Sequence, residues 1–175
     1  MKNLILALSL VLTAASAFAQ NQTVVRWRQL VGVVTAPGID NPVPGPLDAN
    51  GNATSAIHSG AGPWTAKDGS ARVNLATGEG SFEVEGLVLN GGNASGTPGS
   101  ITSVIGTFVC NPGKSNQAVV DTPPTALSSQ GNAELSFRLS FPTGCTSPLF
   151  LIRIPGAGRW IATGVTPATS DSFGY

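Results

Sequence analysis

The chain has 175 residues, a length that suits one domain. It carries nine Lys and Arg against nine Asp and Glu, and its 22 glycines and 13 prolines make up one residue in five. This composition excludes a polybasic nucleic-acid-binding protein, an acidic disordered chain and a protein of long helices. The apolar share of 41% is enough for a buried core. The sequence alone does not identify a function, but it constrains the compartment, the architecture and the available chemistry.

Residues 1–19 have the features of a secretory signal peptide. Lys2 provides a positive start, residues 4–12 form an apolar run, and Ala17 and Ala19 are the small residues that precede a cleavage site. We predict cleavage after Ala19 and one domain over residues 20–175 that is secreted or periplasmic. An uncleaved anchor is the alternative, but the apolar run is too short to cross a bilayer. We expect no membrane span in the mature chain.

Residues 20–31 form the first uninterrupted segment of the mature chain. No other run without glycine or proline in the mature chain exceeds ten residues, and this one is rich in valine and contains Trp27. Such residues favour a strand over a helix. We therefore expect almost no helix in the protein, a strand over residues 24–34, and a core position for Trp27.

Residues 35–69 form a proline- and glycine-rich segment that is too long for an ordinary connection. It is expected to be a packed irregular loop, a binding loop or a partly mobile insertion. Its two candidate binding residues are His58, the only histidine of the chain, and Trp64. An exposed Trp64 ring could stack on a sugar or anchor a protein partner. The alternative is that Trp64 packs onto the domain and that His58 is simply solvated.

Residues 48–52 of this segment alternate oxygen-bearing side chains as a calcium loop does. The glycine stands at the fourth position instead of the sixth, and Ser59 occupies the twelfth position, where a calcium loop has glutamate. An ordinary Asn-Gly turn explains the same residues. Asn52 also begins an N-x-S/T triplet, as do Asn21 and Asn93, so glycosylation stays open.

Residues 70–77 and 81–89 are predicted to form a hairpin around residues 78–80. The alternation of side chains places one set inward, consisting of Ala71, Val73, Leu75, Phe82 and Val84. Arg72, Asn74, Glu83 and Glu85 then face outward. Paired carboxylates such as Glu83 and Glu85 can serve as acid and base in glycoside hydrolysis, but a solvated strand face explains them equally well.

Further strands are expected over residues 101–110, 117–121, 132–141, 149–154 and 159–165. The run 132–141 alternates most regularly, whereas 149–154 is nearly all apolar and is expected to be buried on both faces. Cys110 ends one strand and Cys145 precedes another, which favours a disulfide between them in an oxidising compartment. Two free thiols are the alternative. A metal site is not expected, because two thiols and a distant histidine do not make a tetrahedral set.

These eight strands predict an all-β fold, an antiparallel two-sheet β-sandwich with one long irregular loop; a closed barrel is the alternative. No catalytic motif and no cofactor site is evident. We therefore expect an exported non-catalytic protein that binds a protein or glycan, or that is a structural component of the cell envelope. The alternative is an exported hydrolase of glycans or peptides with acid–base residues among Asp40, His58, Glu83 and Glu85.

Overall fold

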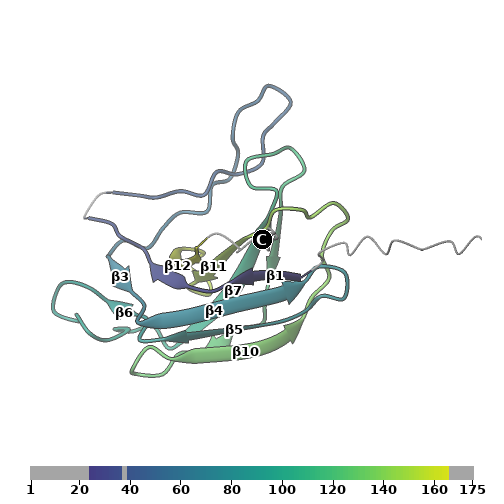
Figure 1. Ribbon diagram of the computed structural model, residues 1–175. Coiled ribbons are helices and arrows are strands. Elements are labelled where there is room, and N and C mark those ends of the chain that lie inside the picture. The colour runs from purple at the N-terminus through teal and green to yellow at the C-terminus, as the bar shows by residue number, and fades with distance from the viewer. Residues whose placement is uncertain (1–23, 37–38, 166–175) are drawn as a thin grey trace, which may run out of the picture.

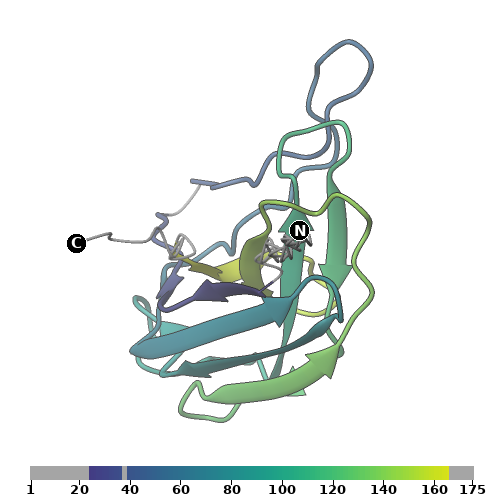
Figure 2. The same ribbon diagram turned by 45° about the vertical axis from the view of Figure 1, so that its right-hand side comes forward.

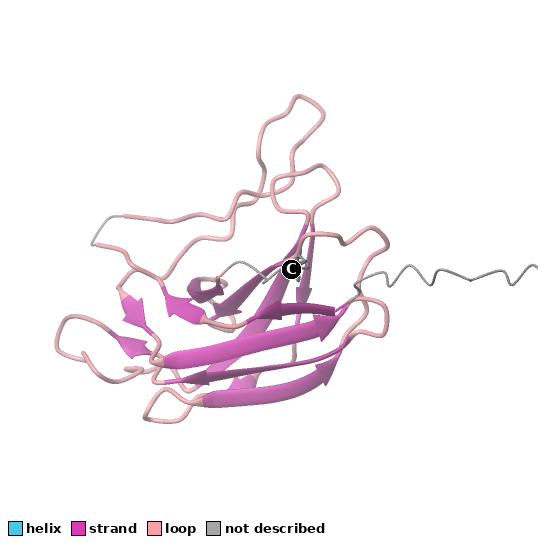
Figure 3. Ribbon diagram, in the orientation of Figure 1, coloured by secondary structure: helices cyan, strands magenta, loops and turns pink. Residues whose placement is uncertain are grey.

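The computed structural model describes residues 24–36 and 39–165. The predicted signal peptide, residues 1–19, lies outside the described residues. Strands and loops account for the whole described chain, with no helix and therefore no helix that could cross a membrane (Figure 3). The prediction of an all-β protein is confirmed.

Four strands form the first sheet, which we call sheet A. Their order is β1 (Val24–Trp27), β4 (Asp68–Asn74), β5 (Glu79–Glu85) and β10 (Ala133–Arg138), and all neighbours are antiparallel. Figure 1 shows these four strands side by side. The predicted hairpin is confirmed as β4 and β5, with its inward residues Ala71, Val73, Phe82 and Val84 at most 3% exposed.

The second sheet, sheet B, lies behind sheet A in Figure 1. Its order is β2 (Leu30–Gly32), β12 (Trp160–Gly164), β11 (Leu149–Arg153), β7 (Ser103–Cys110) and β8 (Ala118–Asp121), again antiparallel. The short β9 (Thr125–Ala126) also pairs with β7. Phe150, Leu151 and Ile152 are all fully buried, which confirms that β11 is covered on both faces.

Aromatic rings from both sheets meet in the core. Phe108 of β7 lies with its ring centroid 5.1 Å from Phe150, 5.3 Å from Phe141, 5.6 Å from Phe137 and 5.8 Å from Trp27. Rings in this range of separations add to the hydrophobic gain of burial. Two antiparallel sheets that share this aromatic core are consistent with a β-sandwich.

Two of the predicted strands are each divided into two, and two short strands were not predicted. Residues 24–36 and 39–165 contain twelve strands where the sequence suggested eight, because residues 24–34 divide into β1 and β2 and residues 81–89 into β5 and β6 (Val88–Leu89). The other two additions are β9 and β3 (Trp64–Thr65), which pairs with β6. The chain crosses from sheet A to sheet B at residues 28–29, so β1 is an edge strand of sheet A and β2 an edge strand of sheet B.

The long segment 35–69 is irregular but packed. Isolated bridges join Val43 to Ile57 and Leu47 to Ala53, and Val43 and Ile57 belong to the buried core. The prediction of one continuous loop is wrong at its end, because β3 and the first residues of β4 lie within it. The segment runs over the domain and its tip projects from it (Figure 2).

Candidate functional site

The outer face of sheet A carries a concentration of charge. Strand alternation directs one set of side chains into the core and the other set away from it. The chain has nine Lys/Arg and nine Asp/Glu residues, and half of this total stands on or beside the outer side of sheet A. We call this surface the charged face; its charged residues are Arg26, Arg28, Asp68, Arg72, Glu79, Glu83, Glu85, Glu134 and Arg138.

Like charges lie directly opposite one another on the charged face. Arg26 of β1 is the register partner of Arg72 of β4, and Glu83 of β5 is the register partner of Glu134 of β10. A third like-charged pair, Asp68 of β4 with Glu85 of β5, stands further along the sheet. Directly opposed residues of this kind have Cβ atoms about 5 Å apart, and like charges there lower stability. The sheet thus has an arginine end toward β1 and a glutamate end toward β10.

Hydroxyl groups, not opposite charges, contact these residues. Ser81 Oγ accepts from Arg72 Nε at 3.0 Å, and Ser70 Oγ donates to Glu83 Oε1 at 3.0 Å. The ion pair that the structure does show on this face, Arg138 with Glu79 at 3.8 Å, lies at its periphery and is largely exposed. Among the described residues the opposed arginines and glutamates therefore have no neutralising partner within 4 Å.

A hollow of about 730 Å³ lies over the middle of the charged face. The pairs Arg26–Arg72 and Glu83–Glu134 border it, and Arg28 does so as well. Its floor is formed by the sheet itself, whose aromatic side chains Trp27 and Phe82 point inward and are 1% and 2% exposed. The hollow is consequently bordered by both polar and apolar surface, and the two aromatic rings beneath it do not form an exposed platform.

The sequence identified only part of this surface. Glu83 and Glu85 do lie on the same outer side of β5, as predicted. Across the strands, however, the charged register partner of Glu83 is Glu134, a residue that the sequence did not single out. Arg26 was not singled out either. The regular alternation of charged residues in both strands was the available signal, but only the register shows which of them meet.

His58 and Asp40 come together in the long segment. His58 Nδ1 contacts Asp40 Oδ2, and the two side chains are 55% and 40% exposed. Asp40 Oδ1 also accepts from the backbone N–H of Ser59 at 2.9 Å. The hydrogen bond from His58, followed by that from the Ser59 amide, holds the pKa of Asp40 below its usual value of 3.8.

The arrangement around Asp40 differs from a Ser-His-Asp nucleophile. In such a triad the histidine contacts the serine oxygen, which must be accessible to substrate. Here Ser59 Oγ lies 3.2 Å from Asp40 Oδ1, accepts from the Asn41 N–H at 3.1 Å, and belongs to a residue that is 1% exposed. The serine therefore holds the loop together and is not placed for attack.

The same cluster fastens the long segment to β12. Trp160 donates from its backbone N–H to the His58 carbonyl at 3.0 Å and from Nε1 to the Asn41 carbonyl at 2.8 Å. Arg159 NH1 donates to the Ser59 carbonyl at 2.7 Å. His58 thus belongs to the cluster that attaches the long segment to β12. Its side chain is exposed and does not border the hollow of sheet A.

Trp64 is buried, at 5% exposure, so of the two interpretations open from the sequence its packing onto the domain is correct, and Trp64 is not an exposed binding residue. The reason is the close approach of β3 to β2: Trp64 donates its N–H to the Val33 carbonyl at 2.9 Å. Gly32 permits this approach, since a Cβ there would lie 2.2 Å from the Trp64 carbonyl oxygen. Trp64 consequently contributes to the core and offers no surface for stacking.

Residues 48–52 form the predicted Asn-Gly turn. Asp48 Oδ1 accepts from the N–H of Asn50 at 2.8 Å and of Asn52 at 2.9 Å, and Gly51 has a φ of +81°. The amide of Asn52, then that of Asn50, lowers the pKa of Asp48 from 3.8. The carboxylate oxygen is thereby engaged in closing the turn.

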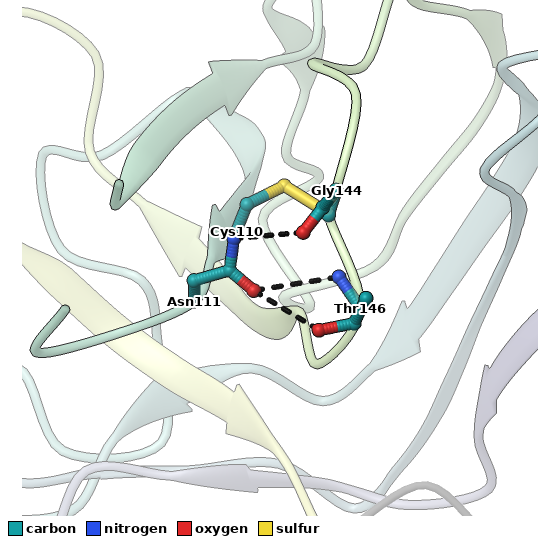
Figure 4. Close-up of a disulfide and its surroundings, with 5 residues drawn as sticks. Cys110, Asn111, Gly144 and Thr146 are labelled. Atoms are coloured by element: carbon teal, nitrogen blue, oxygen red, sulfur yellow. Dashed lines mark hydrogen bonds between the residues drawn. A yellow bond between two sulfur atoms is a disulfide. The ribbon is translucent and has the colours of Figure 1, made fainter. Parts of the chain in front are cut away.

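The predicted disulfide between Cys110 and Cys145 is present, with Cα atoms 5.0 Å apart (Figure 4). Asn111, next to Cys110, reinforces this corner: Nδ2 donates to the Gly144 carbonyl at 2.9 Å, and Oδ1 accepts from Thr146 Oγ1 at 3.2 Å. The bridge joins the end of β7 to the segment before β11. Disulfides are typical of proteins in oxidising compartments.

The described part of the chain contains no group of three or more His, Cys, Asp or Glu side chains arranged to hold a metal ion. Comparison of the sequence with protein-family models and with curated proteins, and of the fold with solved structures, finds no match. The charged face is therefore interpreted from its own chemistry.

Proposed function

We propose that the protein is exported, is not an enzyme, and binds its ligand on the charged face of sheet A. Export rests on the signal-peptide features of residues 1–19 and the disulfide, which together favour the periplasm or the extracellular space. The mature chain would begin at Gln20.

One observation carries the binding proposal. A protein with few charges places half of them on one sheet face, over a hollow, with like charges opposed and not neutralised. A sheet face exposed to water requires polar side chains. It does not require like charges opposite one another, because such pairs lower the stability of the fold. A ligand that supplies the missing countercharges and hydrogen bonds would offset that cost.

The test uses mature protein on an array of polysaccharides and peptides. The face variant replaces Arg26, Arg72, Glu83 and Glu134 with serine, and the control variant replaces the exposed Lys67 and Lys114, which do not border the hollow, with serine. Wild type and control are expected to bind a common ligand that the face variant loses. A ligand bound equally by all three proteins would overturn the assignment of the site.

A second candidate function, hydrolysis of a glycan, is favoured by one specific feature. Glu83 and Glu134 are direct neighbours on adjacent strands and border the same hollow, and paired carboxylates can act as acid and nucleophile. The hydrolase hypothesis predicts that a bound polysaccharide is shortened with time. Glu83→Gln would abolish this shortening, and any shortening of the polysaccharide by the wild-type protein would refute the non-catalytic proposal.

A further inference from the structure

We propose that the ligand of the charged face is an acidic polysaccharide in which acidic and uncharged sugars alternate. This inference rests on the proposed function and specifies the chemistry of its ligand. It depends on the two ends of the face, the arginine end (Arg26, Arg28, Arg72) and the glutamate end (Glu83, Glu134).

The arginine end is suited to a carboxylate. Arg26 and Arg72 are register partners, Arg28 borders the same hollow, and no acidic side chain lies within 4 Å of them among the described residues. Guanidinium groups present planar pairs of N–H donors that match the two oxygens of a carboxylate. An acidic sugar bound here would relieve the repulsion between the opposed arginines.

The glutamate end excludes a second carboxylate. Glu83 and Glu134 are both acceptors that repel an anion, while each can accept hydrogen bonds from sugar hydroxyl groups. The midpoints of the two pairs lie two strands apart and two residues out of register, roughly 12 Å by standard strand spacings. Arg72 and Glu83 themselves stand diagonally on adjacent strands, roughly 8 Å apart. A chain that crosses both ends must therefore carry a negative unit at one and an uncharged, hydroxyl-rich unit at the other.

The rest of the face favours a sugar chain over a peptide or a neutral glycan. Ser70 and Ser81 stand between the two ends and Ser136 stands beside Glu134, and all three border the hollow as hydrogen-bond donors and acceptors. Stacking on aromatic rings is unavailable, because the rings under the hollow point into the core. Carboxylate binding and hydroxyl bonding are the interactions that this surface provides.

The experiment measures binding of the mature protein to three polysaccharides by calorimetry. The probes are hyaluronan oligosaccharides, which alternate glucuronate with N-acetylglucosamine, a homopolymer of uronate, and neutral dextran; a polyglutamate peptide is added as a carboxylate polymer without sugars. Hyaluronan is expected to bind most tightly, with an affinity that falls as salt is raised.

Two variants separate the ends of the face. Arg26→Ser with Arg72→Ser is expected to weaken hyaluronan binding about tenfold or more, since charged hydrogen bonds are lost. Glu83→Gln with Glu134→Gln is expected to raise the affinity for the homopolymer, because the repulsion disappears. The control Lys67→Ser with Lys114→Ser removes the same positive charge as the arginine variant and should leave binding unchanged.

The outcomes distinguish this inference from the proposed function. Equal binding of dextran, or of polyglutamate, with sensitivity to the face variant would overturn the ligand class and leave the binding face in place. Binding to none of the probes would also overturn the ligand class. The array of polysaccharides and peptides would then show whether the charged face binds any ligand. Equal affinity for hyaluronan and the homopolymer would refute the role of the glutamate end.

Discussion

Replacing Cys110 and Cys145 with alanine is predicted to remove a large part of the stability of the folded domain. The bridge joins residues 35 apart, and closing a loop of this length removes unfolded-state entropy worth about 4 kcal/mol at 25 °C. A domain of this size is stable by only about 5–15 kcal/mol. The hydrogen bonds of Asn111 at the same corner exist only in the folded state and cannot replace the constraint on the unfolded chain.

Urea unfolding followed by tryptophan fluorescence measures this loss. With a slope of about 2 kcal/mol per molar urea, the midpoint of the double variant should fall by roughly 2 M. Wild-type protein unfolded in the presence of a reductant is the control and should give the same midpoint as the variant. A loss of less than about 1 kcal/mol in both would refute the entropic reasoning.

Three further predictions concern the core, the disulfide corner and the pH dependence of stability. Phe108→Ala should destabilise the domain by about 3–5 kcal/mol in chemical unfolding, because four rings pack around Phe108. Asn111 has a φ of +51°, so Asn111→Ala should lose about 1–3 kcal/mol and more than Asn111→Gly, which keeps the backbone relaxed; equal losses would show that the side-chain bonds dominate. The lowered pKa of Asp48 stabilises the fold at pH values above its unfolded value of 3.8, and this contribution is lost as the pH falls through the lower folded value. The stability difference between wild type and Asp48→Asn should therefore shrink below pH 4 in acid titrations of unfolding, and a constant difference would contradict the assignment.

Local patterns in the sequence were sufficient for three of the strands of sheet A, β4, β5 and β10. In residues 132–141 and in the hairpin, polar and apolar side chains alternate without interruption, and each strand lies where that period places it. The disulfide was also predictable, because only two cysteines are present and they stand near strand ends. These features depend on neighbouring residues or on composition.

Features that depend on distant residues were not predictable. The break between β1 and β2 interrupts a run with uniform strand propensity, and Trp27 fits at this point only because Gly164 lacks a side chain: a Cβ there would lie 2.4 Å from the indole ring. The burial of Trp64 likewise depends on Gly32. In each case a glycine far along the chain makes room for a tryptophan.

The charged face was missed for the same reason. Its opposed pairs join residues about fifty positions apart, Arg26 with Arg72 and Glu83 with Glu134, so no local window contains either pair. Composition gave no indication either, since a low content of charged residues does not show that half of them lie on one surface.

The cost of the opposed charges provides a test that needs no ligand. Glu134→Arg places a cation opposite Glu83 and converts a repulsive pair into an attractive one, which should raise stability by about 0.5–1 kcal/mol. Glu134→Gln removes only the repulsion and should give a smaller gain. Both values can be measured by urea unfolding at low salt, and added salt should reduce both gains.

Such a gain would mean that the natural sequence keeps a less stable arrangement on this face than one substitution could provide. Stability given up at a surface position is typical of a site maintained for binding. Glu134→Arg should accordingly weaken ligand binding while it stabilises the fold. If the substitution leaves stability unchanged or lowers it, the opposed glutamates carry no cost, and the physical argument that the charged face is maintained for a ligand fails.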